Sequence, residues 1–165
     1  MTPVSPSPDL ARIGECALAE VLKTFLSLPA TVCGSADSSL LSSAPEPITS
    51  RVLLSGQRLS VDVHLQLPVA FLAQAVEQLT GLDGDSAEAT ALQEDTAGEL
   101  ANMVAGRVAA QLAASGYPCR LGTPSVARNA TLPPAPGPGS DCGRTNLLCA
   151  GHSVWLEIQC RYQVP

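Results

Sequence analysis

The chain has 165 residues, of which 45% are apolar and only 3% aromatic, so we expect one domain whose core is built from Leu, Val and Ala. The formal net charge is −6 at pH 7, and there is no basic stripe of the kind that binds nucleic acid or anionic lipid. No apolar run reaches the roughly 18–20 residues that cross a bilayer, and the N-terminus lacks the pattern of a secretory signal. We therefore predict a cytoplasmic protein that binds neither nucleic acid nor membrane.

The first third of the chain predicts a tail, a helix and a loop. Residues 1–8 contain three prolines and two serines and are expected to form a flexible tail before a single domain over 9–165. Apolar residues at helical spacing predict a helix over about Asp9–Leu28, whose first residue is a suitable N-cap. A short strand is expected at 30–33, and Ser and Pro favour a loop over 34–47.

A hairpin and two further helices are predicted next. The strands of the hairpin are expected at 51–55 and 59–67, because apolar and polar residues alternate in the second strand and a short polar turn separates the two. Pro68 then opens a helix that ends near Leu79, since proline is tolerated in the first helical turn. An acidic loop leads into the longest helix, roughly 89–114.

The last third of the chain is expected to be mainly strands. We predict strands at 124–130, 144–150 and 153–164, with the last two joined at Gly151, and a Pro-rich loop at 132–139 that cannot pair because proline lacks the backbone donor. The order of helix, short strand, loop and hairpin thus occurs twice. The predicted fold class is α+β, in which two long helices and a shorter one pack on a mainly antiparallel sheet with a pseudo-twofold repeat.

Residues that could carry other chemistry form no recognisable site. The six cysteines contain no CxxC pair and are expected to be reduced thiols. Cys142, Cys149 and His152 are close in sequence, but their spacing fits no common zinc pattern, so we interpret these cysteines as small, half-buried residues. His64 and His152 lack the partners of a catalytic triad.

Asp83, Asp85 and Glu94 stand where a calcium loop places its first, third and last ligands. That loop also needs an oxygen ligand where Ala87 stands and a glycine where Glu88 stands, so no metal site is predicted.

The most informative segment is GELANMVAG, which begins at Gly98. Glu99 and Asn102 are three residues apart in the longest helix, so their side chains lie on one face. Gly98 and Gly106 flank them, although glycine costs about 1 kcal/mol relative to alanine in a helix interior. We interpret these glycines as allowing the close approach of another backbone. Asp95 falls in the same narrow arc of the helix.

A polar pair at i and i+3 is by itself usually only a solvated helix face. Here the pair stands among small residues, and a Glu followed three residues later by an Asn occurs only once in the sequence. Both observations favour a functional site. The opposite side of the helix carries Leu100, Val104 and Val108 and is expected to pack inward. Arg107 and Gln111 also fall in this apolar half.

The segment DTAGELANMVAGRVAAQL, followed by GTPSV, resembles the signature helix and following strand of the CheX family of chemotaxis phosphatases, within the CheC/CheX/FliY group. The upstream segment VDVHLQLPVAFLAQAVEQLTG is similar to the family's strand, Pro-initiated helix and terminal Gly. The resemblance covers about residues 9–163, and the signature helix is its specific part. It implies a CheC/CheX-like fold.

The resemblance also implies a function. Glu99 and Asn102 match the family's catalytic residues, and Gly98, Asp95 and Gly106 are expected to contact the partner. The implied activity is hydrolysis of the aspartyl phosphate of a phosphorylated CheY-like response regulator in two-component or chemotaxis signalling. The regulator would bind Mg²⁺, the protein would need no cofactor of its own, and a homodimer paired through the sheets is implied.

The chemistry of the two side chains suits this role. Phosphoryl transfer needs mainly positioning and charge management, so the Asn102 amide can orient the attacking water while Glu99 forms a charge-assisted bond with a lysine of the regulator. Two alternatives remain. The chain could be a non-catalytic module that binds response regulators, or a structural dimer domain of a flagellar or signalling assembly.

Overall fold

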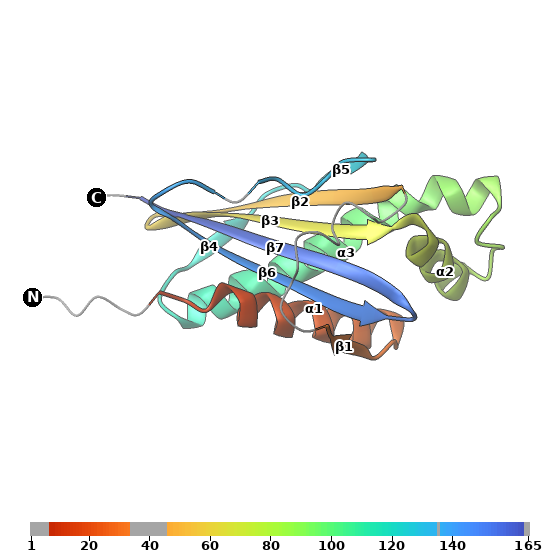
Figure 1. Cartoon of the computed structure of the whole chain (residues 1–165), viewed down its shortest axis with the longest axis horizontal. Coiled ribbons are helices and arrows are strands. Elements are labelled where there is room, and N and C mark those ends of the chain that lie inside the picture. Colours follow the sequence, from red (N-terminus) through yellow and green to blue (C-terminus); the bar gives the residue numbers. More distant parts are fainter. Residues whose placement is uncertain (1–6, 34–45, 135, 164–165) are drawn as a thin grey trace, which may run out of the picture.

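The computed structural model describes residues 7–33, 46–134 and 136–163. Within these ranges the chain forms three helices and seven strands (Figure 1). The helices are α1 (Leu10–Leu26), α2 (Val69–Thr80) and α3 (Ala87–Ala114). The strands are β1 (Ala30–Val32), β2 (Pro47–Gly56), β3 (Leu59–Pro68), β4 (Cys119–Leu121), β5 (Ser125–Arg128), β6 (Ser140–Cys149) and β7 (His152–Tyr162).

The strands form one antiparallel sheet in the order β1-β6-β7-β3-β2-β4, with β5 also paired to β2. The hairpins β2–β3 and β6–β7 meet at the centre of the sheet, and each is flanked by a short strand from the other half of the chain. Helices α1 and α3 occupy equivalent places in the two halves, while α2 has no counterpart. The predicted α+β fold with a pseudo-twofold repeat is confirmed.

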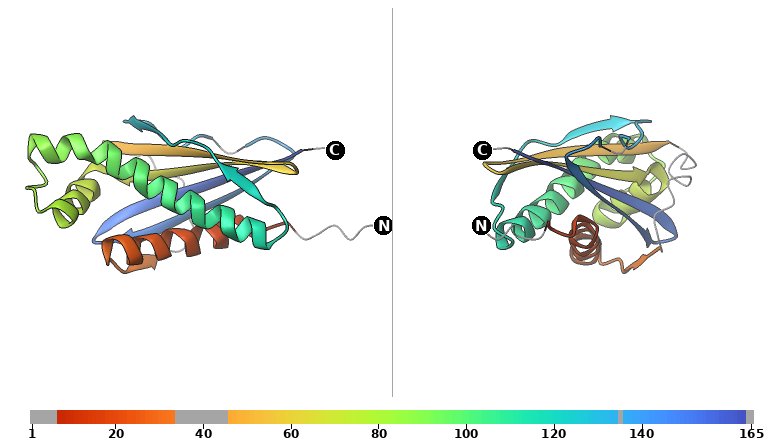
Figure 2. Two further views of the ribbon diagram at one scale, coloured as in Figure 1. Left: turned by 180° about the vertical axis from the view of Figure 1, so that it is seen from behind. Right: turned by 60° about the vertical axis from the view of Figure 1, so that its left-hand side comes forward.

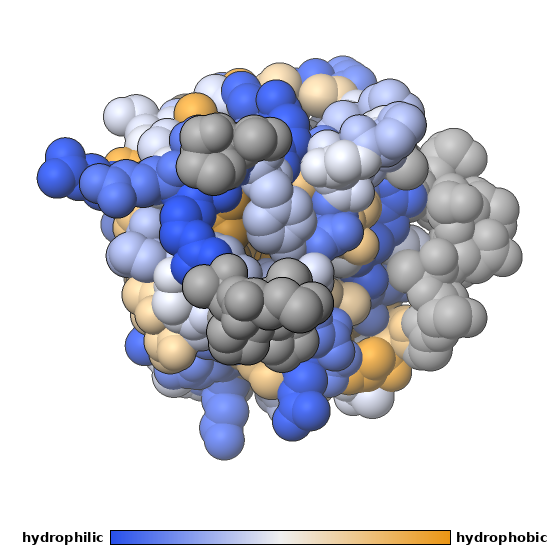
Figure 3. Space-filling view, turned by 90° about the vertical axis from the view of Figure 1, so that its left-hand side faces the viewer, coloured by the Kyte–Doolittle hydropathy of each residue, from blue (hydrophilic) through white to orange (hydrophobic). Residues whose placement is uncertain are grey.

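The helices cover one face of the sheet, which we call the inner face. Seen from behind, α1 and α3 lie side by side across it, and α2 packs beside the first half of α3 (Figure 2). The described chain begins and ends at the end of the molecule opposite α2 (Figure 1). On that end hydrophobic residues form small patches among hydrophilic ones (Figure 3). The side chains on the inner face are mainly apolar, and the helices bury them by packing against this face. The domain therefore has two layers, one of helices and one of strands.

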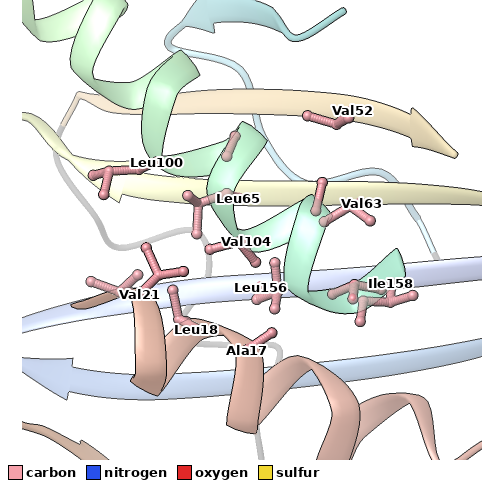
Figure 4. Packing of buried hydrophobic residues seen from close by; sticks show 14 of the residues in the cluster. Ala17, Leu18, Val21, Val52, Val63, Leu65, Leu100, Val104, Leu156 and Ile158 are labelled. Carbon is pink, nitrogen blue, oxygen red and sulfur yellow. The ribbon is translucent and has the colours of Figure 1, made fainter. Parts of the chain in front are cut away.

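The core lies between this face and the helices. Ala17 and Leu18 of α1 and Val104 of α3 point toward side chains of the central strands, such as Leu156 and Ile158 (Figure 4). All five side chains are aliphatic and fully or almost fully buried. The core is therefore aliphatic, as the low aromatic content predicted.

The other face of the sheet, the outer face, is polar but mostly buried. Residues 129–134, here called the crossover segment, leave β5 and pass over this face on the way to β6. Side chains of four outer-face residues donate hydrogen bonds to its carbonyls; they are Thr49 and Gln66 to Ala130, Arg144 to Pro133 and Gln159 to Pro134. Beneath it Glu157 is completely buried and pairs with Arg144. The alternation of apolar and polar residues in the strands did not predict that the crossover segment covers the polar face.

Several element boundaries differ from the prediction. Strand β2 begins at Pro47 instead of 51, because its first half pairs with β5 as well as with β3. Strand β4 was not expected, since three residues carry too little pattern to be recognised. The predicted strand at 124–130 is shorter, and α3 begins at Ala87 because the Ser86 side chain caps it. Most of the loop predicted at 34–47, and most of the predicted tail, lie outside the described residues.

The helix over Asp9–Leu28 is confirmed with its cap, because the Asp9 carboxylate accepts a hydrogen bond from the Arg12 backbone N–H at 3.1 Å. The turn between β6 and β7 has positive φ at Ala150 and Gly151, a backbone typical of a tight hairpin turn. No helix in the described part of the chain is long and apolar enough to cross a membrane.

Candidate functional site

Glu99 and Asn102 lie near the middle of α3, on the side that faces away from the sheet. Both are exposed, as is Asp95 one turn earlier, while Leu100, Val104 and their neighbours on the opposite side are buried. The predicted orientation of the helix is therefore confirmed. We call the row formed by the exposed Asp95, Glu99 and Asn102 and the half-buried Gly106 the α3 stripe.

Contacts on both flanks fix α3 in place. On one side the Arg107 guanidinium lies 3.2 Å from the Glu20 carboxylate of α1. The Arg107 side chain is exposed, and it does not belong to the apolar half of the helix in which its spacing had placed it. On the other side Arg128 of β5 contacts Glu94 at 2.6 Å and donates a hydrogen bond to the Thr90 carbonyl. The stripe thus runs along a helix held between α1 and β5.

The two glycines of the signature segment have different surroundings. Gly98 is buried, and a Cβ added there would lie 3.3 Å from Val126 Cγ2 of β5. What lies against Gly98 is therefore a side chain of the protein's own strand β5. Gly106 is half-buried, and an added Cβ would meet only Leu121 Cδ2, at 3.9 Å. Ordinary contact of this kind does not require glycine.

Glu99 and Asn102 are available to an incoming molecule. Within the described residues, neither side chain forms a hydrogen bond or an ion pair. Because a helix surface is convex, it cannot enclose a small substrate as a pocket does. The pair is suited to enter a cavity of a partner macromolecule that brings the reacting group.

Three hollows of the molecule lie elsewhere, and neither Glu99 nor Asn102 lines any of them. The largest, about 440 Å³, lies between α2, the start of α3 and β5. A second, about 290 Å³, lies beside His64 on the outer face. The third, about 50 Å³ beside Tyr117, has room for only one or two water molecules.

The cysteines and histidines do not form a second site. All six cysteines are free, and burial raises the pKa of the Cys160 thiol to about 11 and also that of Cys149, which leaves these thiols protonated and weakly nucleophilic. Burial lowers the pKa of His64, which lies under the edge of the crossover segment. In the described part of the chain, no three His, Cys, Asp or Glu side chains are grouped so that they could hold a metal ion.

Comparison with known families agrees with this geometry. A sequence model of the family described as chemotaxis phosphatase CheX matches residues 48–136, more than half of the chain, including all of α3. The chain belongs to the CheX family. Among proteins with curated descriptions, none matches it significantly.

Solved structures of CheX and related proteins share the fold. CheX from Vibrio vulnificus superposes with a TM-score of 0.75 at 17% identity, over 93% of this chain and 100% of that one. A chain from the CheX–CheY–BeF3–Mg²⁺ complex of Borrelia burgdorferi gives a TM-score of 0.69 at 16% identity, over 91% and 96% of the two chains. FliY from Thermotoga maritima gives 0.60 at 19% identity, over 98% and 91%. The whole described architecture is thus that of the CheX/CheC/FliY group.

Proposed function

We propose that this CheX-family protein hydrolyses the aspartyl phosphate of a CheY-like response regulator, with Glu99 and Asn102 as its catalytic residues. The observation that carries the proposal is the exposed pair, which has no hydrogen-bond or ion-pair partner among the described residues, on a helix fixed from both sides. Membership of a family of chemotaxis phosphatases supports the activity, and the complex of a relative with CheY supports the class of partner.

In this mechanism α3 carries the two side chains into the active site of the regulator. The Asn102 amide donates and accepts hydrogen bonds, so it can hold a water molecule in line with the phosphorus without acting as a strong base. The Glu99 carboxylate bonds to a lysine of the regulator and fixes the docked geometry. Because phosphoryl transfer has a loose transition state, this positioning supplies most of the catalysis that the chain can offer.

Mg²⁺ belongs to the regulator in this proposal. The α3 stripe offers two carboxylates and one amide along an exposed helix, a donor set that does not surround an ion, whereas Mg²⁺ demands near-octahedral oxygen ligation. The metal on the regulator would neutralise charge on the phosphoryl oxygens. The chain then needs no cofactor of its own.

We also propose a homodimer, as the family resemblance implies. Since the crossover segment occupies much of the outer face, a second copy would have to pair along the remaining sheet surface or a sheet edge. Sedimentation equilibrium at micromolar concentration measures the mass directly. A monomer at every concentration would contradict the dimer without affecting the phosphatase proposal.

The test is phosphate release from a Mg²⁺-loaded CheY-like receiver that has been phosphorylated with acetyl phosphate. We expect the wild type to accelerate release and Asn102→Ala to lose at least about tenfold of kcat, equivalent to about 1.4 kcal/mol of barrier. Glu99→Ala should chiefly raise KM, because it weakens docking. Gln111→Ala removes an amide on the far side of the same helix, and Glu77→Ala removes an exposed carboxylate of α2, so both controls should resemble the wild type.

The main alternative is a non-catalytic module that binds response regulators through the same stripe. It predicts that phosphorylated receiver binds more tightly than unphosphorylated receiver while the rate of phosphate loss stays unchanged. If neither binding nor acceleration occurs with any of several receivers, a purely structural role is the remaining interpretation.

A further inference from the structure

An exposed leucine extends the α3 stripe. Leu121, at the end of β4, pairs in register with Leu54, which is completely buried under the helices. Both side chains therefore point to the inner face, yet Leu121 remains 43% exposed. Such an exposed apolar side chain stabilises the fold little, because it is only half removed from water.

The residue of α3 beside this leucine is a glycine. Leu121 Cδ2 lies 3.9 Å from the position that a Cβ of Gly106 would occupy, so a larger residue at 106 would cover the leucine. Gly106 follows Asn102 by four residues and Glu99 by seven, which places it on the same helix face. Gly106 therefore places Leu121 beside the helix face that carries Asn102 and Glu99.

Nothing within the described chain requires glycine at this position. The added Cβ would make only ordinary van der Waals contact, and alanine would favour the helix over glycine. Gly98 differs, because a Cβ added there would lie only 3.3 Å from Val126 Cγ2. Packing within the described chain therefore does not explain the glycine at 106.

We propose that Leu121, left open by Gly106, is a docking residue for the receiver domain on which Glu99 and Asn102 act. This inference rests on the proposed function. The receiver would place an apolar side chain on Leu121 next to its phosphorylated aspartate, so that contact with Leu121 sets affinity while the α3 pair carries out the chemistry. Leu121 does not touch the reacting atoms and is not a catalytic residue.

The experiment uses the full-length chain and the acetyl-phosphate-treated receiver described above, and it measures kcat and KM for each variant. Leu121→Ser should raise KM by about fivefold to tenfold and leave kcat unchanged, since it removes apolar contact but no reacting group. Leu53→Ser is the matched control, because Leu53 is 39% exposed and points to the outer face, opposite Leu121. Its KM should equal that of the wild type.

A second variant separates docking from folding. Gly106→Leu should cover Leu121 and fill the surface beside Asn102, so KM should rise at least about tenfold while the melting temperature stays equal or increases, as leucine is the better helix former. A residue with a merely structural role would not lose affinity while the fold gains stability.

The outcomes distinguish this inference from the proposed function. If the wild type accelerates phosphate release and Asn102→Ala does not, but Leu121→Ser and Gly106→Leu keep the wild-type KM, then docking at Leu121 is wrong and the phosphatase stands. If the wild type binds phosphorylated receiver without acceleration, the phosphatase proposal fails, and weaker binding by Leu121→Ser still supports the docking residue. If Leu121→Ser and Gly106→Leu both keep the binding and the rate of the wild type, the inference is overturned.

Discussion

The two glycines that flank Glu99 and Asn102 have different surroundings in one helix. Gly98 allows β5 to lie against α3, and this contact, with the ion pair between Arg128 and Glu94, fixes the first half of the stripe. Gly106 makes no comparable contact. From the sequence we interpreted both glycines as allowing the close approach of a partner, and this prediction stays untested for Gly98. The contact with Val126 is enough to explain why a small residue stands at position 98.

A bulky residue at 98 should therefore destabilise the protein. Gly98→Leu would collide with the Val126 side chain, and we expect the free energy of unfolding to fall by about 1–3 kcal/mol, as in other overpacked sites. Urea denaturation measures this value, with Gly106→Leu as the matched variant. Equal stability of the two variants would contradict the different environments of the two glycines.

His64 gives the outer face a dependence on pH. Its pKa is lowered chiefly by burial and also by Arg51 of β2, against the opposing effect of Asp62 and of Glu157 on β7. The folded protein therefore binds a proton at this histidine less readily than the unfolded chain, whose value is near 6.5. Where the unfolded state binds more protons, stability falls as pH decreases.

We expect the free energy of unfolding to decrease between about pH 7.5 and 5.5, and His64→Gln to lose less stability over this interval because it cannot titrate. Urea denaturation of both proteins at several pH values provides the comparison. Identical pH profiles would show that His64 keeps its ordinary pKa in the fold.

At the scale of elements, the crossover segment is the feature that changes the character of the sheet. It covers part of a polar face on which Arg144, Glu157, His64 and Arg51 follow one another across four strands. Glu157 and His64 are buried there. Buried carboxylates of this kind need a charged or hydrogen-bonding partner. Glu157 has Arg144 and also accepts a hydrogen bond from Gln159 at 2.6 Å.

Removal of this partner should be costly. We expect Arg144→Ala to lower the free energy of unfolding by about 3 kcal/mol, because Glu157 would remain buried without its cation. Arg107→Ala breaks the exposed pair with Glu20 and should change stability by less than about 1 kcal/mol. Chemical denaturation of the two variants tests the contrast, and similar losses would mean that the crossover segment does not keep water from Glu157.

At the scale of the whole molecule, charge is divided between the two layers. The helices and the α2–α3 loop carry nine acidic and three basic residues, whereas strands β2 to β7 carry five basic and three acidic ones. The layer that presents the α3 stripe is therefore strongly negative. Such a surface attracts a partner whose docking site is positive, as a receiver with bound Mg²⁺ and a lysine would be.

Ionic strength should accordingly affect the encounter with the receiver. We expect kcat/KM to fall several-fold when salt is raised from about 0.05 to 0.5 M, because screening weakens long-range attraction. Asp95→Asn should reduce this salt dependence more than Glu77→Gln on α2. A flat salt profile would indicate that docking depends on the apolar contact alone.

The sequence by itself determined the local elements and the residues of the stripe. Periodicity showed the three helices, both hairpins and the inner side of α3, because each of these patterns depends on neighbours within a few residues. The spacing of Glu99 and Asn102 fixed their common face for the same reason. Strand β4, the early start of β2 and the exposed position of Arg107 were not predicted, because each depends on a partner far away in the chain.

Only the tertiary structure decided which surfaces are open. The pairing of each short edge strand with the opposite half, the cover of the crossover segment over His64 and Glu157, and the contact of Val126 with Gly98 all join residues distant in sequence. No periodic pattern encodes such contacts, since they arise from the packing of whole elements. Leu121 is a candidate docking residue because it lies beside Gly106, and the folded chain alone shows that these two residues are neighbours.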